Sequence, residues 1–88
     1  MQEGLNRQKY KRILGAIVKA RRMASKKSIT LISAETGMTK SMWADLEKGI
    51  KDPQLSTLIR IAEGLNVSTS EIIKELEKSL GENFTLTD

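Results

Sequence analysis

The sequence predicts a single all-α domain of five helices. Apolar residues recur at intervals of three and four along most of the chain, which is the period of amphipathic helices. Glycines and Ser/Thr caps divide this pattern into five segments, and no β-hairpin signal or internal repeat interrupts it. At 88 residues, the chain has room for one domain with a small core.

The first helix is expected over about residues 6–23. A polar run at residues 24–27 ends the pattern. Its apolar face consists of Tyr10, Ile13, Leu14, Ile17 and Val18.

The second helix is short and lies at about residues 28–36. Ser28 is a suitable N-cap, because its hydroxyl can accept a free backbone N–H of the first turn. Gly37 ends the helix, since the position after a helix often needs a left-handed backbone. Ile32 lies on its inner face, and Met38 is expected to fill the angle to the next helix.

The third helix is expected over residues 40–48. Thr39 is its N-cap and Gly49 ends it. Trp43 and Leu46 are one turn apart, so both can face the core.

Two further helices follow a loop at residues 49–54, where Pro53 prevents helix continuation. The fourth covers about residues 55–65. A capping box of Ser68 and Glu71 opens the fifth, which Gly81 ends. The apolar positions of the two helices are Leu55, Leu58, Ile59, Ala62 and Leu65, then Ile72, Ile73, Leu76 and Leu80. The predicted organisation is an extension at residues 1–5, a domain at 6–80 and a tail at 81–88.

Several function classes conflict with the composition. Without cysteine or histidine, the chain has no disulfide, no Cys/His zinc site and no thiol or imidazole catalyst. It also lacks a Gly-rich phosphate loop and a nucleophile beside a base, so we expect no enzyme, no cofactor and no metal. The longest apolar stretch, residues 13–18, is too short for an export signal or a membrane span. We therefore expect a cytoplasmic protein of a bacterium or phage.

Charge is distributed unevenly along the chain. The net charge is +4, yet residues 1–27 carry nine basic residues and one acidic residue, a balance of +8. Residues 28–53 sum to −1 and residues 54–88 to −3. This polarity predicts a basic face for an anionic partner and an acidic face elsewhere.

The second and third helices form the pattern of a helix-turn-helix, two short helices joined by a tight glycine turn. In that motif the second helix enters the DNA major groove while the first crosses the backbone. With Trp43 and Leu46 turned inward, the opposite face of the helix is free for bases. This face carries Lys40, Ser41, Met42, Ala44, Asp45 and Lys48.

The motif lies within a longer resemblance. Residues 13–76 resemble the lambda-repressor-like helix-turn-helix family of the Cro/XRE type, most specifically through Gly37-Met38-Thr39, Leu46-Glu47-Lys48-Gly49, Pro53 and Ile61-Ala62. The resemblance implies a compact five-helix DNA-binding domain in a sequence-specific transcriptional regulator. It further implies a repressor that binds a palindromic operator as a homodimer, with the recognition helix at residues 40–48.

The resemblance also assigns roles to individual residues. Arg22 and Glu47 match an internal ion pair that locks the first helix to the third. Base contacts are expected from Lys40, Ser41 and Asp45, and from Met42 on the same face. Phosphate contacts are expected from Ser28, Thr39, Lys48 and Lys51.

For all of the DNA-facing residues, the alternative is that they form an ordinary solvent-exposed helix face without contacting DNA. Asp45 has its own alternatives, because it can accept from a cytosine amino group or pair with Lys48 three residues on.

The chain departs from the family at four positions around the second helix. Ile29 and Leu31 replace polar residues, Lys27 replaces a buried apolar residue, and Ser33 replaces a small alanine. An exposed Ile29 or Leu31 could equally contact another protein.

A second functional hypothesis concerns the residues that are available for contact with another protein chain. Leu80, Phe84 and Leu86 are expected to lie beyond the reach of the core and are assigned to a dimer interface. The alternative function is a protein-interaction module, such as an antitoxin-like partner that binds DNA only within a complex. The acidic C-terminal third would then contact that partner.

Overall fold

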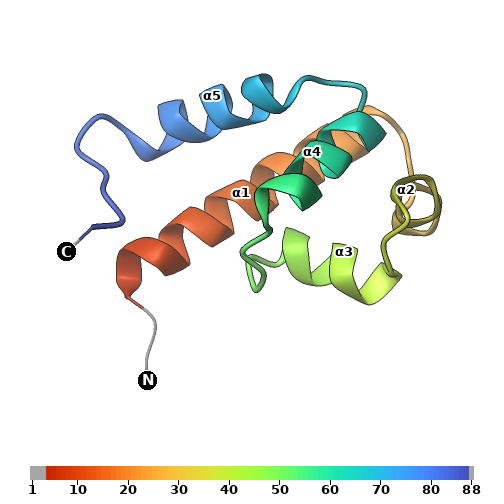
Figure 1. The fold of residues 1–88 in the computed structure, drawn as a ribbon, viewed down its shortest axis with the longest axis horizontal. Coiled ribbons are helices and arrows are strands. Elements are labelled where there is room, and N and C mark those ends of the chain that lie inside the picture. The colour runs from red at the N-terminus through yellow and green to blue at the C-terminus, as the bar shows by residue number, and fades with distance from the viewer. Residues whose placement is uncertain (1–3, 88) are drawn as a thin grey trace.

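The computed structural model of the protein describes residues 4–87 and has the predicted all-α architecture. Most of the predicted extension at residues 1–5, and the last residue of the tail, lie outside this range. The five helices in order are α1 (Leu5–Ala24), α2 (Ile29–Thr36), α3 (Lys40–Glu47), α4 (Leu55–Gly64) and α5 (Thr69–Leu80) (Figure 1).

Short-range signals account for the helix boundaries. The hydroxyls of Ser28, Thr39 and Ser68 each accept the backbone N–H of the third residue of the following helix. Gly37 ends α2 with a left-handed φ of 68°. Each boundary lies within one or two residues of the position expected from the sequence.

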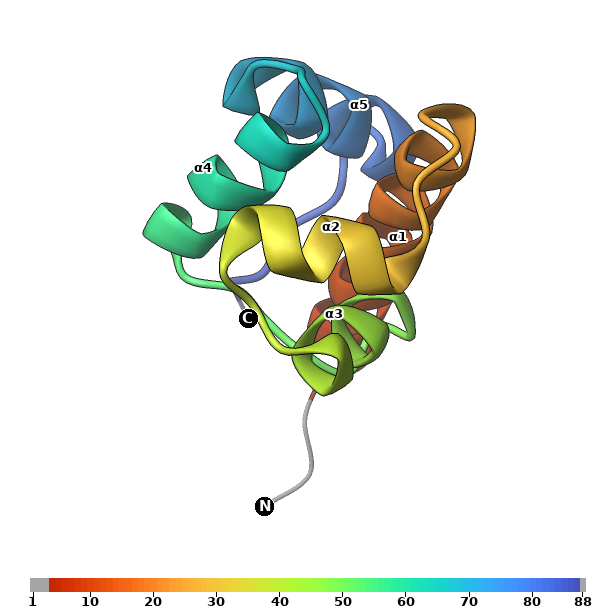
Figure 2. The same cartoon turned by 90° about the vertical axis from the view of Figure 1, so that its right-hand side faces the viewer.

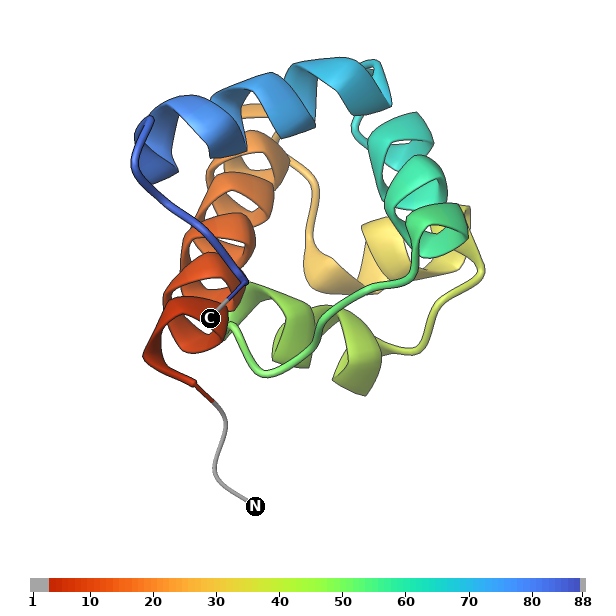
Figure 3. The ribbon, with the colours of Figure 1, turned by 60° about the vertical axis from the view of Figure 1, so that its left-hand side comes forward.

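The helices surround one core (Figure 3). α1 packs against α3 and α5, α2 packs against α3 and α4, and α4 closes the arrangement on α5. The central side chains include Leu14, Val18, Ile32, Trp43, Leu46, Ile61 and Ile72, none of them more than 2% exposed. α3 is therefore held from behind by both α1 and α2.

α1 and α3 approach closely at Gly15. A Cβ atom at this position would lie 2.4 Å from the carbonyl oxygen of Leu46. The absent side chain lets the two backbones come together, so the orientation of α3 depends directly on α1.

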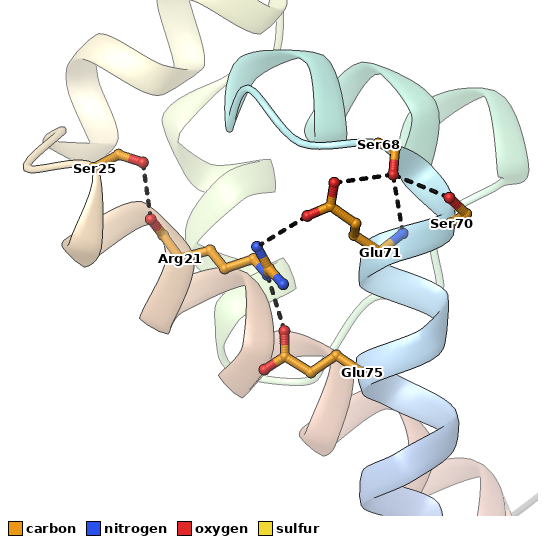
Figure 4. A network of polar contacts seen from close by, with 6 residues as sticks. All are labelled: Arg21, Ser25, Ser68, Ser70, Glu71 and Glu75. Atoms are coloured by element: carbon orange, nitrogen blue, oxygen red, sulfur yellow. Dashed lines mark hydrogen bonds and ion pairs between the residues drawn. The ribbon is translucent and has the colours of Figure 1, made fainter.

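Polar contacts link α1 to α5 (Figure 4). The Arg21 Nε atom donates to the Glu75 carboxylate over 2.9 Å, and an Arg21 Nη lies 3.9 Å from Glu71. The Glu71 carboxylate also accepts a hydrogen bond from the Ser68 hydroxyl over 3.3 Å, which is a side-chain contact between the two residues of the predicted capping box. Because these groups are partly exposed, their contacts add little to the free energy of unfolding, and their main effect is to orient α5.

Two apolar residues of α4 are exposed to solvent. Leu55 and Ile59 are 67% and 44% exposed, whereas Leu58, Ile61 and Leu65 are buried. The apolar stripe of α4 is wider than the surface that its neighbours cover, and Leu55 and Ile59 lie on its outer edge. Both therefore belong to the apolar stripe of α4 but not to the core.

At the end of α5, Leu80 packs against the core and is partly buried. The expectation that Leu80 lies beyond the reach of the core is therefore wrong.

The tail after α5 folds back along the first turns of α1. Asn6 donates its side-chain N–H to the carbonyl of Thr85 over 2.9 Å, and Lys9 Nζ lies 6.0 Å from the centre of the Phe84 ring. The start of α1 and the tail after α5 consequently lie on the same side of the molecule, away from α2 (Figure 1).

Candidate nucleic-acid interface

The turn between α2 and α3 is built from buried apolar side chains. Met38 is 8% exposed, while Trp43 and Leu46 on α3 are 0% and 2% exposed. Figure 2 shows α2 and α3 crossing at one side of the molecule, with the tight turn between them. Since these anchors fix the rotation of α3 about its axis, they determine which of its residues face solvent.

The solvent side of α3 carries the predicted base-contacting residues. Lys40 and Ser41 are exposed, Met42 is 42% exposed, and Asp45 is half-buried at the edge of this face. Among residues 4–87, no ion pair joins Asp45 to Lys48. The side-on pair considered as an alternative for Asp45 is therefore not formed in this structure.

The predicted phosphate-contacting residues frame this helix. Ser28 and Thr39 sit at the N-termini of α2 and α3, where their hydroxyls accept from Leu31 and Met42 at 3.0 and 3.1 Å. A hydroxyl that accepts a backbone N–H keeps its own proton, which remains free for a phosphate oxygen. Lys48 and Lys51 are exposed beyond the C-terminal end of α3.

Behind α3, Arg22 and Glu47 are in direct contact. The Arg22 Nε and Nη2 atoms donate to the two carboxylate oxygens over 2.6 and 3.1 Å. The two side chains are only 13% and 5% exposed. The hydrogen bond to Glu47 is the main reason that the pKa of Arg22 is raised, so the guanidinium is permanently charged.

Two members of this cluster were missing from the sequence-based assignment. The Trp43 indole N–H donates to Glu47 over 2.6 Å, and Arg22 donates to the carbonyl of Lys27 over 2.8 Å. The spacing of Trp43 and Glu47, four residues apart on one helix, is the signal that could have indicated the first contact. The second depends on the path of the chain after α1.

The departures from the family are accommodated in different ways. Lys27 donates to Glu35 over 2.8 Å and to the carbonyl of Gly64 over 2.9 Å, joining α2 to α4. Ser33 is 3% exposed, and its hydroxyl has no hydrogen-bond partner among the described residues. Ile29 packs against the core, whereas Leu31 is 46% exposed.

No helix within residues 4–87 is long and apolar enough to cross a membrane. The same part of the chain contains no group of three or more acidic, histidine or cysteine side chains placed to hold a metal ion.

Comparisons with known proteins agree with this geometry. The sequence model of the helix-turn-helix family HTH_3 matches residues 18–72. The crystal structure of the clp gene regulator ClgR from Corynebacterium glutamicum is similar over 90% of this chain and 97% of its own, with a TM-score of 0.74 and 20% identity. An HTH_3 family transcriptional regulator from Vibrio cholerae is 27% identical, with a TM-score of 0.75 over 84% of this chain and 42% of that one.

No curated protein matches the sequence. The family match covers more than half of the chain and includes α2, the turn and α3. The chain therefore belongs to the helix-turn-helix family HTH_3 and is a DNA-binding helix-turn-helix protein of the transcriptional-regulator type.

Proposed function

We propose that the protein is a sequence-specific repressor that binds a palindromic operator as a homodimer. The observation that carries this proposal is the orientation of α3, which buries Trp43 and Leu46 and turns Lys40, Ser41 and Met42 toward solvent. A helix anchored in this way can enter the major groove without unfolding any part of the core.

Base selection is assigned to the exposed side of α3. Lys40 can donate to guanine, Ser41 can donate or accept, and Met42 can contact a thymine methyl group. Asp45 can accept from a cytosine amino group, and its charge disfavours other bases at that position. Together these four residues give the helix a mixed donor, acceptor and apolar surface.

Phosphate binding is assigned to residues around the recognition helix. Ser28 and Thr39 lie at helix N-termini, where the helix dipole and free backbone N–H groups favour a negative charge. Lys48 and Lys51 add positive charges at the other end of α3. These contacts supply affinity and fix the register, whereas the base contacts supply specificity.

Dimensions favour a dimer on DNA. The domain measures 38 × 28 × 21 Å, and adjacent major grooves on one face of B-DNA lie about 34 Å apart. Two copies in contact about a twofold axis can therefore present both recognition helices one helical turn apart. We assign the contact to Leu80, Phe84 and Leu86, of which Leu86 is 49% exposed and the other two are half-buried.

The test begins with selection of bound sites from random duplexes, followed by anisotropy titrations on the selected and a scrambled duplex. A palindromic consensus and a dimer by sedimentation are the expected results. If the purified protein shows no preference for any sequence at about 0.1 M salt, the autonomous regulator fails and a protein-interaction module remains.

Single variants then separate the two classes of contact. Lys51→Ala should weaken binding to both duplexes equally and lower the slope of log K against log salt by about one. Ser41→Ala should instead change the preferred operator, at about 1–3 kcal/mol for a lost base contact. Lys74→Ala, which removes the same charge from the exposed side of α5, is the matched control and should leave binding nearly unchanged.

A further inference from the structure

The first two turns of α1 lie beside the loop between α3 and α4 (Figure 3). Gly49, at the start of this loop, has a φ of 78°, and a Cβ atom there would lie 2.7 Å from the Cα atom of Arg12. Lys11 donates its ammonium to the carbonyl of Ile50 over 3.1 Å. This half of α1 lies outside the family match at residues 18–72.

Two side chains of α1 hold the carboxylate of Asp52 in that loop. The Tyr10 hydroxyl donates to Oδ1 over 2.8 Å, and the Arg7 guanidinium forms an ion pair with Oδ2. Each carboxylate oxygen thus has its own partner, which fixes the position and the orientation of Asp52. We call Arg7, Tyr10 and Asp52 the loop clamp.

The position of the clamp matters because Asp52 follows Lys51 directly. An unpaired carboxylate beside a phosphate-binding lysine would repel the DNA backbone and attract the lysine to itself. The clamp turns the carboxylate toward α1 and offsets its charge with Arg7. Burial, followed by the hydrogen bond to Asp52, raises the pKa of Tyr10 from 10.0 to about 12, so its hydroxyl stays a donor to Asp52 well above neutral pH.

We propose that the loop clamp positions the α3–α4 loop so that Lys51 reaches a DNA phosphate, with Tyr10 and Arg7 as positioning residues. This inference rests on the proposed function, since it requires Lys51 to contact DNA. It differs from a purely structural role, which would affect stability without altering the number of phosphate contacts.

The decisive variant is Tyr10→Phe, which removes one hydroxyl and changes no charge. Binding to all duplexes should weaken about three- to tenfold, the loss expected for one charge-assisted contact. The salt slope should fall by about one, as in Lys51→Ala, although Tyr10 itself carries no charge that could release counterions. When Tyr10→Phe is added to Lys51→Ala, the DNA affinity should fall by less than a further twofold.

The matched control is Ser25→Ala. Like Tyr10→Phe it removes one hydroxyl hydrogen bond from α1, but that bond leads to the Arg21 carbonyl at the other end of the helix, away from both the loop and the tail. Affinity and salt slope should remain those of the unmodified protein. Asp52→Asn provides a second variant: a purely electrostatic effect would tighten DNA binding, whereas loss of the clamp weakens it.

The proposal is overturned if Tyr10→Phe leaves the salt slope unchanged. It is also overturned if the affinity loss of the double variant equals the product of the losses in Tyr10→Phe and Lys51→Ala. Amide hydrogen exchange without DNA separates this failure from a failure of the proposed function. The amides of Gly49 and Ile50, bonded to Leu46 and Asp45, should exchange faster in Tyr10→Phe than in Ser25→Ala. Equal exchange in the two variants would show that the clamp does not order the loop, whatever DNA the protein binds.

Discussion

Replacing Glu47 by glutamine is the most direct perturbation of the contact between α1 and α3. Glu47 is 5% exposed and accepts from Arg22 twice and from Trp43 once. Glutamine has nearly the same shape but no charge, and its amide group brings a donor to a site that needs only acceptors. The substitution therefore leaves the guanidinium of Arg22 nearly buried without a counter-charge.

The expected cost is large for a domain of this size. Stranding one charge of a buried pair costs about 3–5 kcal/mol. A domain of 88 residues has a total stability of about 4–13 kcal/mol. At about 4–8 °C per kcal/mol, the unfolding midpoint should fall by at least about 12 °C.

Thermal and urea unfolding followed by far-ultraviolet circular dichroism measure this loss. Glu77→Gln, on the exposed side of α5, is the matched control and should stay within about 0.5 kcal/mol of the unmodified protein. Adding Arg22→Met to Glu47→Gln should restore part of the stability, because no charge is then stranded. A loss below about 1 kcal/mol for Glu47→Gln would refute the view that this pair locks α3 to α1.

Two further predictions concern single buried or half-buried groups. Because the folded state raises the pKa of Tyr10 from 10.0 to about 12, stability is fully present below pH 10 and should decline as pH rises through this window. Tyr10→Phe should flatten the decline, and an equally steep fall in the variant would contradict this origin. Ser33→Ala should raise stability by about 1 kcal/mol in urea titrations by removing an unpartnered buried hydroxyl. The same change at exposed Ser79 provides the control for helix propensity, and equal gains at both sites would contradict a burial effect.

The helix boundaries were predictable because their signals are local. Ser28, Thr39 and Ser68 cap helices through contacts within three residues of themselves, and Gly37 ends α2 by its own backbone conformation. Such signals act before any tertiary contact forms, so sequence patterns contain them directly.

The contacts that the sequence did not predict depend on how the helices are placed in space. The loop clamp joins residues 42 and 45 positions apart, and the tail contact joins residues 79 apart. No spacing rule connects such positions, and α1 must first pack against α3 for the loop to meet it. The exposure of Leu55 and Ile59 has the same origin, because a helical stripe does not reveal how much of its width a neighbour covers.

For the residues assigned to DNA contacts, one property was predictable from the sequence and another was not. That Lys40, Ser41 and Met42 face solvent followed from the inward positions of Trp43 and Leu46 on one helix. What each contacts on DNA remains a prediction, since it depends on a docking geometry that the chain alone does not contain.

The location of Trp43 gives this protein a built-in optical probe. It is the single tryptophan of the chain, it is fully buried, and its indole N–H is bonded to Glu47 on the side of α3 opposite to the proposed base-contacting face. Its intrinsic fluorescence therefore reports how firmly α3 is packed against the core, and the measurement needs no label. Any mutation, temperature or partner that loosens α3 can thus be detected in the unlabelled protein before its effect on DNA binding is measured.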